Sequence, residues 1–211
     1  MHYRLICTLS IAITAAFVSN TPIHADEPAA VTTAAKEKVV TLAGGCFWCT
    51  EAVFEKMEGV NDVVSGYIGG KNANPTYKQV TTGLTNHAEA VEVYYNPEKV
   101  RFEELLTMFF KTHDPTTLNK QGADMGTQYR SSIFYRDEEQ KKKSEAYIKK
   151  IGKDFRSPIV TQLEKATTFY PAEEYHQDFF RKNPGHGYCR VVVASKVLKA
   201  KKVIDTMKKD K

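Results

Sequence analysis

The chain has 211 residues, of which 42% are hydrophobic, with a formal net charge of +5 and four cysteines. This length allows one domain with a substantial core that needs no disulfide or metal to hold it together. The positive charge comes mostly from scattered lysines with no aromatic residues between them, a pattern that does not indicate a nucleic-acid-binding protein.

The first residues are typical of a secretory signal peptide. A short basic start precedes a mostly apolar, uncharged run over residues 5–18, and Ile23-His24-Ala25 resembles a small-residue cleavage site. The apolar run is shorter than the ~20 residues that a membrane span needs, which argues against a retained anchor. We therefore expect a signal peptide over residues 1–25 and a secreted or periplasmic protein with no stable membrane association.

After the signal peptide, composition divides the chain into three parts. Residues 26–38 are rich in Ala, Thr, Pro and charge and are expected to form a flexible leader. Residues 39–205 have the length and patterning of one domain, and residues 206–211 form a basic tail. No later apolar run is long enough to cross a bilayer. We expect the protein to be a monomer.

Hydrophobic periodicity predicts helices and strands throughout the domain. The clearest helix covers residues 102–110, where apolar residues recur at i, i+3, i+4, i+7 and i+8. Asp137 is the predicted N-cap of a later helix with Gln140 in the capping-box position, and its predicted buried stripe is Tyr147, Ile148, Ile151 and Phe155. The strands are expected over residues 39–43, 60–67, 88–95, 131–135 and 159–163, and the other helices over 51–57, 77–81, 137–155 and the chain after 193.

Several connections between the predicted strands are too short for parallel crossovers. The strand over residues 131–135, for example, follows a loop over residues 116–128 and not a helix. The pattern favours an α+β fold over a doubly wound sheet, specifically a two-layer α/β sandwich with a mainly antiparallel, ferredoxin-like sheet.

The most informative motif is Gly44-Gly45-Cys46-Phe47-Trp48-Cys49. It lies where the first predicted strand turns through two glycines into a helix. The amides and the dipole of a helix N-terminus stabilise a thiolate, so we expect a lowered pKa for Cys46. Cys46 is the candidate nucleophile, and Phe47 and Trp48 are candidates for the wall of an apolar pocket. A buried structural thiol is the alternative.

Glu89 is the candidate acid. Alternation along its strand places it on the same face as Val91, Val93 and Tyr95. Burial there raises the pKa of a carboxyl group and keeps it protonated near neutral pH, as a proton donor requires. A carboxylate at the rim of the sheet, paired with a lysine, is the alternative. Three further polar candidates stand in loops rich in Gly, Asn and Thr, namely Tyr77, Asp124 and Tyr129.

Two other functions fit part of the cysteine pattern. Cys46 and Cys49, with His186 and Cys189, have a spacing that zinc accepts, but such a site gives the two glycines no role. Cys46-x-x-Cys49 at a helix start also fits a thioredoxin-like oxidoreductase, although the chain is long for that fold. Removal of Cys7 with the signal peptide leaves three cysteines, so at least one thiol is expected to be free or redox-active.

Taken together, the motifs resemble the A-type peptide methionine sulfoxide reductases. The resemblance covers roughly residues 39–190, in the family's order, and leaves the leader and the lysine-rich end outside. The matching segments are Gly44-Gly45-Cys46-Phe47-Trp48, Gly66-Tyr67-Ile68-Gly69-Gly70, Asn74-Pro75-Thr76-Tyr77, His87-Ala88-Glu89, His113-Asp114-Pro115, Asp124-Met125-Gly126-Thr127-Gln128-Tyr129-Arg130-Ser131, Asn183-Pro184 and Gly187-Tyr188-Cys189.

The resemblance implies a reaction at sulfur. Cys46 would attack the sulfur of methionine S-sulfoxide, and Glu89 would protonate the oxygen with the help of hydrogen bonds from Tyr77 and Tyr129. Methionine would leave, and Cys46 would become a sulfenic acid.

The resemblance also assigns substrate contacts and partners. Phe47 and Trp48 would hold the methyl group, and Asp124 would position the substrate. The expected substrates are oxidised proteins or peptides and free methionine sulfoxide, and the expected function is the repair of oxidised proteins. No metal or organic cofactor is implied, only an external dithiol reductant such as thioredoxin.

A second thiol would convert the sulfenic acid to a disulfide that the reductant clears. Either Cys49 or Cys189 fits this role, or the disulfide passes between them. The Gly-Tyr-Cys loop favours Cys189 because it matches a mobile recycling segment. The sequence departs from the common family pattern at three positions near the motifs, which are Asn86 for glycine, Ala123 for asparagine and Met125 for histidine.

Overall fold

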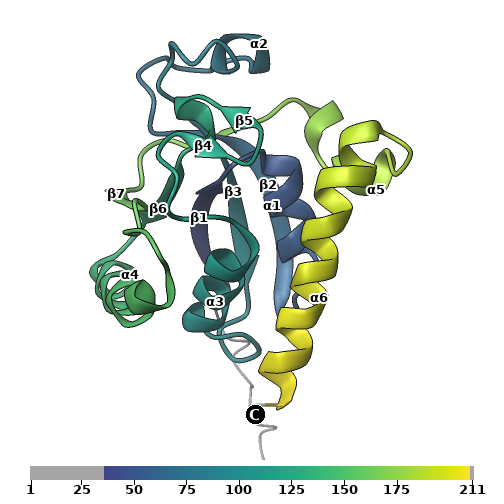
Figure 1. Cartoon of the computed structure of the whole chain (residues 1–211). Helices are drawn as coiled ribbons and strands as arrows, with labels where there is room; N and C mark the ends of the chain where they lie inside the picture. The colour runs from purple at the N-terminus through teal and green to yellow at the C-terminus, as the bar shows by residue number, and fades with distance from the viewer. Residues whose placement is uncertain (1–35, 210–211) are drawn as a thin grey trace, which may run out of the picture. The chain divides into compact units, whose positions relative to one another are not determined.

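The computed structural model describes residues 36–209, which fold around a six-stranded sheet (Figure 1). The signal peptide and most of the leader that the sequence predicts therefore lie outside the described residues. In sheet order the strands are β7 (Gln162–Lys165), β6 (Ser131–Tyr135), β1 (Lys38–Gly44), β3 (Ala88–Tyr95), β2 (Val60–Ile68) and β8 (Tyr170–Pro171).

The sheet is mixed. β6 and β7 pair in parallel, and the other neighbours pair antiparallel. The parallel pair arises because helix α4 (Glu138–Ile151) carries the chain from the end of β6 back towards its start, as a parallel neighbour requires. The predicted combination of helices and strands in one domain is confirmed, and the β6–α4–β7 unit adds one parallel pair that makes the sheet mixed.

The larger core lies between the sheet and three helices, α1 (Phe47–Phe54), α3 (Phe102–Thr112) and α6 (Ala194–Lys209). These helices contact one another and stand on the same face of the sheet (Figure 1). Val91 and Val93 of β3 point into this core, whereas Ala88 and Ala90 belong to a smaller cluster. The predicted alternation of β3 is therefore confirmed.

The turn from β1 into α1 depends on Gly45. Its φ of +95° lies in the region that side chains rarely adopt. A Cβ atom at this position would also lie 2.5 Å from the side chain of Gln121. Glycine therefore lets the chain reverse within one residue, and Cys46 becomes the N-cap of α1.

Helix α4 differs from its prediction in burial. Asp137 is its N-cap and accepts a hydrogen bond from the amide of Gln140 at 2.7 Å, as expected. The expected buried stripe is only half-buried, and the buried residues of this helix are Gln140 and Ser144. Gln140 donates to the carbonyl of Val39 at 2.8 Å, so polar contacts as well as apolar ones attach α4 to the sheet.

The remaining elements are short except at the C-terminal end. They include α2 (Tyr77–Val80), α5 (Phe179–Lys182) and the two-stranded ladder of β4 (Lys120–Gln121) and β5 (Asp124–Met125) in a predicted loop. A π-helix over Cys189–Val193 continues into α6, which contains the described part of the predicted basic tail. Within residues 36–209, no helix is both long and apolar enough to cross a membrane.

Candidate active site

The site is built on the N-terminus of α1. Cys46 is buried there, with 8% of its surface exposed, ahead of the first helical residue, Phe47. The amide of Phe47 donates a hydrogen bond to Glu89 Oε2 at 3.1 Å. Because Phe47 directly follows Cys46, this bond brings the predicted acid of β3 next to the predicted nucleophile of α1.

The pKa of Cys46 differs from the sequence prediction. A hydrogen bond to the thiol of Cys49 raises it well above its ordinary value, and burial and the negative charge of Glu89 act in the same direction. The amide of Trp48 lowers the pKa, as expected at a helix start, but this single contribution is outweighed. The predicted low pKa of Cys46 is therefore wrong.

The thiolate character is found at Cys49 instead. Its hydrogen bond with Cys46 and the charge of Lys196 lower the pKa of Cys49 to about 7, against the effect of burial. The Sγ atom of Cys49 lies 3.8 Å from the hydroxyl of Tyr188, which donates to Asp124 Oδ2 at 2.6 Å. A polar chain thus joins Cys46 and Cys49 to Asp124.

Glu89 has the surroundings of a proton donor. Its residue surface is 1% exposed, and burial raises its pKa to about 8 although the amide of Phe47 favours the charged form. Its Oε1 atom has no hydrogen-bond partner among the described residues. The predicted burial and raised pKa of Glu89 are therefore present, and the alternative of a lysine-paired rim carboxylate does not describe this residue.

Two tyrosines share this environment. Burial raises the pKa of Tyr77 to about 12 and also raises that of Tyr129, and the charges of Glu89 and Cys46 contribute at both residues. Both tyrosines are half-buried and pack against the core that contains Cys46 and Phe47. The structure therefore brings both phenol groups into the environment of the acid and the thiol, with their protons retained near neutral pH.

Aromatic rings form a wall beside the thiols. The ring of Phe47 lies 5.1 Å from that of His176 and 6.3 Å from that of Tyr77. Trp48 donates its indole N–H to His176 Nδ1 at 3.1 Å, and its ring stacks on Phe179 at 3.6 Å with an interplanar angle of 5°. The predicted pair Phe47 and Trp48 is therefore held in place by residues far away in the sequence.

Cys189 does not occupy the predicted mobile loop. It is fully buried at the start of the π-helix, where burial and the charge of Cys49 raise its pKa. All three cysteines of the described chain are free thiols. The structure therefore places Cys49, and not Cys189, in direct contact with Cys46.

Several residues of the site were missed by sequence reasoning. His176 and Phe179 contact Trp48, yet they follow Cys46 by more than a hundred positions and show no local pattern of their own. Tyr188 belongs to the Gly-Tyr-Cys motif, but its contact with Cys49 was not predicted. Glu51, a buried carboxylate one turn after Trp48, was also missed. The only available signal for Glu51 was a carboxylate among apolar residues of a predicted helix.

Two of the departures from the family pattern have a structural explanation. Asn86 has a φ of +60°, a left-handed conformation that asparagine tolerates better than most residues, and its carbonyl accepts a bond from Arg130 at 3.2 Å. Met125 is 72% exposed, so its side chain is compatible with its place at the surface.

A zinc site is not assembled. Among residues 36–209, no group of three or more His, Cys, Asp or Glu side chains is arranged to hold a metal ion. The Cys46, Cys49, His186 and Cys189 set of the zinc alternative is therefore not a metal centre in this structure.

A thiol pair at a helix start, with a protonated carboxyl group beside it, defines the class of thiol-dependent oxidoreductases. The family model of the peptide methionine sulfoxide reductases matches residues 38–209. The chain is 67% identical over 163 residues to peptide methionine sulfoxide reductase MsrA 1 of Rhodopirellula baltica, covering 77% of this chain and 85% of the relative. The chain therefore belongs to the A-type peptide methionine sulfoxide reductases.

Solved structures agree with this assignment. Reduced Mxr1 from Saccharomyces cerevisiae is 39% identical, with a TM-score of 0.70 over 73% of this chain and 90% of Mxr1. Mxr1 in its complex with Trx2 gives a TM-score of 0.51 at 29% identity, over 68% of this chain and 85% of that one.

The raised pKa of Glu89 predicts a pH-dependent stability. An acid with a folded pKa near 8 and an ordinary value of 4.5 stabilises the fold only while it is protonated. The contribution is complete below about pH 4.5 and is lost as the pH rises towards 8. Relative to Glu89→Gln, the free energy of unfolding of the wild type should fall over this interval by on the order of a few kcal/mol.

Urea denaturation of both proteins across this pH range measures the difference. The exposed Glu98 provides the control, because Glu98→Gln should follow the wild-type curve at every pH. A wild-type curve that runs parallel to that of Glu89→Gln would show that Glu89 is ionised in the folded protein.

Proposed function

We propose that this protein reduces methionine S-sulfoxide, in proteins or as the free amino acid, and thereby repairs oxidised proteins. The proposal rests on the hydrogen bond from the Phe47 amide to the buried Glu89. Because Phe47 directly follows Cys46, this bond holds a carboxylic acid close to the thiol. Sulfoxide oxygen leaves sulfur only when it is protonated, and this arrangement supplies an acid and a nucleophile together.

In the first step, Glu89 gives its proton to the sulfoxide oxygen while the sulfur of Cys46 attacks the substrate sulfur. The proton of the Cys46 thiol passes to the Cys49 thiolate, with which it shares a hydrogen bond. The attack forms a sulfur–sulfur bond to the substrate. This bond and the sulfur–oxygen bond of the substrate then break as the hydroxyl oxygen bonds to the Cys46 sulfur, so methionine leaves and Cys46 becomes a sulfenic acid. Two protons move and the total charge is unchanged, since Glu89 becomes a carboxylate as Cys49 becomes a thiol.

Tyr77 and Tyr129 retain their protons and assist as hydrogen-bond donors to the oxygen, in line with their raised pKa values. Phe47 and Trp48 receive the methyl group. Their rings stack on those of Tyr77 and Phe179 and so form an apolar surface. Asp124, which accepts a hydrogen bond from Tyr188 beside Cys49, positions the substrate. A sulfoxide of the S configuration thus directs its oxygen to the donors and its methyl group to the rings.

In the second step, Cys49 attacks the sulfenic acid, a Cys46–Cys49 disulfide forms and water leaves. A spacing of three residues in the first turn of a helix suits a disulfide, and the two thiols interact before the reaction. Cys189 then attacks the Cys49 sulfur of this disulfide, which releases Cys46 as a thiol and leaves a Cys49–Cys189 disulfide. The effect of the Cys49 charge on the pKa of Cys189 supports this pairing. A thioredoxin-like dithiol reduces the resulting disulfide, a partner supported by the solved complex of Mxr1 with Trx2.

Three further properties are part of the proposal. The protein needs no metal or organic cofactor, and it acts as a monomer. The strand order β6-β1-β3-β2, with α1 after β1 and α3 after β3, supports a ferredoxin-like core to which β7 and β8 are added at the edges.

The function is tested with a methionine S-sulfoxide peptide and thioredoxin. Cys46→Ser should abolish turnover, because oxygen is a much weaker nucleophile at neutral pH. Glu89→Gln should lower kcat/KM by roughly 10²–10⁴, as is typical for the loss of a general acid. The rate of the wild type should fall as the pH rises through about 8, because Glu89 loses its proton there.

Glu98→Gln is the matched control, since it removes a carboxylate from the exposed surface, and it should keep the wild-type rate. Reduction of protein disulfides with no turnover of the sulfoxide peptide would favour a general thiol–disulfide exchanger and would overturn the proposed function.

The order of the two resolving thiols is tested by one turnover without reductant. Cys49→Ser should form the Cys46 sulfenic acid more slowly, because the proton acceptor is lost, and should then accumulate it for dimedone to trap. Cys189→Ser should stop at a Cys46–Cys49 disulfide. Mass spectrometry of the digested variants identifies each product. Rapid formation of a Cys46–Cys189 disulfide in Cys49→Ser would show that Cys189 resolves Cys46 directly, and full steady-state activity of Cys189→Ser with thioredoxin would show that it is dispensable.

We also propose that the chain is exported and cleaved near Ala25, as its basic start and apolar run suggest. The full-length chain, expressed in a bacterium with a periplasm, should yield a mature protein that begins near Asp26. N-terminal sequencing of the periplasmic fraction measures this. A full-length protein confined to the cytoplasm would contradict the export.

A further inference from the structure

One face of α1 carries a carboxylate that the proposed reaction does not use. Trp48, Glu51 and Glu55 stand at i, i+3 and i+7, so they point to the same side of the helix. This side faces the segment 172–179, which brings His176 and Phe179 against Trp48. Glu51 is only 1% exposed, and among residues 36–209 no ion pair joins it to a cationic side chain, which is unusual for a buried carboxylate.

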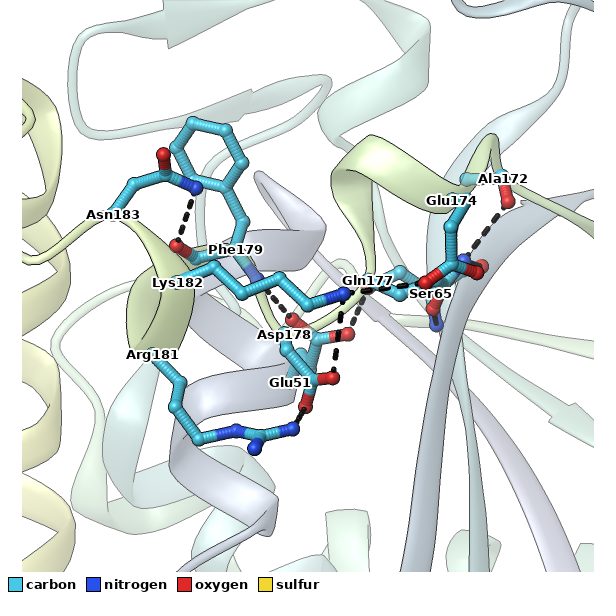
Figure 2. A network of polar contacts seen from close by, with 10 residues as sticks. All are labelled: Glu51, Ser65, Ala172, Glu174, Gln177, Asp178, Phe179, Arg181, Lys182 and Asn183. Carbon is cyan, nitrogen blue, oxygen red and sulfur yellow. Dashed lines mark hydrogen bonds and ion pairs between the residues drawn. The ribbon is translucent and has the colours of Figure 1, made fainter.

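Glu51 holds two distant parts of the chain (Figure 2). Its Oε1 atom accepts a hydrogen bond from the hydroxyl of Ser65 in β2 at 3.1 Å. Its Oε2 atom accepts one from the amide of Phe179 at 3.2 Å, and the amide of Asp178 also donates to the carboxyl group. Asp178 has a left-handed φ of +56°, and the carboxyl group of Glu51 therefore stabilises a turn that few residues adopt.

The same segment is attached to β2 by a second contact. Gln177 accepts a hydrogen bond from the amide of Ser65 and donates to its carbonyl, both at 2.9 Å (Figure 2). Ser65 thus contacts the segment directly through Gln177 and indirectly through Glu51. Arg181 and Lys182 form ion pairs with Asp178 at the exposed side of this network.

We propose that Glu51 is a positioning residue, which holds the Phe179 ring on Trp48 and so fixes the apolar wall that receives the substrate's methyl group. This inference rests on the proposed function. The chemical requirement at position 51 is a hydrogen-bond acceptor for the Phe179 amide. Burial raises the pKa of Glu51 to about 7, so part of the population carries a neutral carboxyl group, which an amide side chain imitates well.

The test compares Glu51→Leu, which removes the acceptor, with Glu51→Gln, which keeps it. In Glu51→Leu, KM for a methionine S-sulfoxide peptide should rise about tenfold while kcat changes little, as expected when a contact of both ground and transition states is weakened. Glu51→Gln should keep KM within about twofold, since the amide oxygen still accepts from Phe179. Arg181→Gln is the control from the exposed side of the network and should keep the wild-type KM.

A second measurement needs no activity. Trp48 is the only tryptophan of the chain, so its fluorescence reports on the wall directly. Glu51→Leu should shift the emission and lower the anisotropy of the reduced, substrate-free protein, whereas Glu51→Gln and Arg181→Gln should match the wild type. Circular dichroism confirms that each variant is folded.

A folded Glu51→Leu with the wild-type emission and KM would overturn the proposal, and so would Glu51→Gln with the same defect as Glu51→Leu. Should Glu51→Leu fail to fold, Phe179→Ala removes the same ring contact from the other side and should reproduce the rise in KM and the change in emission; an unchanged Phe179→Ala would also overturn the proposal. A wild type that reduces no sulfoxide would refute the proposed function, and the fluorescence of the variants would still decide the role of Glu51.

Discussion

The amide of Phe47 and the carboxyl group of Glu89 meet at 3.1 Å in a space closed to solvent, and the geometry of the site depends on this contact. It joins the first turn of α1 to β3, and the two elements supply the thiol and the acid. Burial keeps Glu89 protonated, while the helix amide partly opposes that effect by favouring the charged form. The acid therefore has a pKa close to neutral pH, where it can both give up and recover a proton.

Opposing contributions also determine the pKa values of the two thiols, Cys46 and Cys49. A helix N-terminus alone would lower the pKa of Cys46, but a second thiol in the same turn and a carboxyl group nearby reverse the outcome. Their combined effect raises the pKa of Cys46 and lowers that of Cys49 to about 7, so Cys49 loses its proton before Cys46 does. Cys46 is thus a protonated thiol before the reaction, and its proton acceptor, Cys49, is already in contact with it. The protonated form protects Cys46 from oxidants when no substrate is present, because thiols react far more slowly than thiolates.

Local patterns predicted the parts of the site that depend on neighbours in sequence. The two glycines before Cys46, the alternation of β3 around Glu89 and the capping residue Asp137 all have local physical causes, and the structure places them as predicted. A strand near β7 was predicted, but its parallel pairing with β6 was missed because that pairing depends on how α4 returns the chain to the sheet. The pKa of Cys46 was missed because it depends on the sum of several opposing contributions.

The residues that support Trp48, which are His176 and Phe179, could not be predicted from the sequence for a different reason. His176 and Phe179 acquire their roles only when the segment 172–179 is laid against α1, and that placement depends on Gln177, Ser65 and Glu51. None of these residues shows a helical or strand periodicity that points to the others. The segment has little regular structure, so side-chain hydrogen bonds to backbone amides and carbonyls determine its path. A buried carboxylate in α1 is effective here because it accepts from two directions at once, whereas an apolar residue would leave the Phe179 amide without that partner.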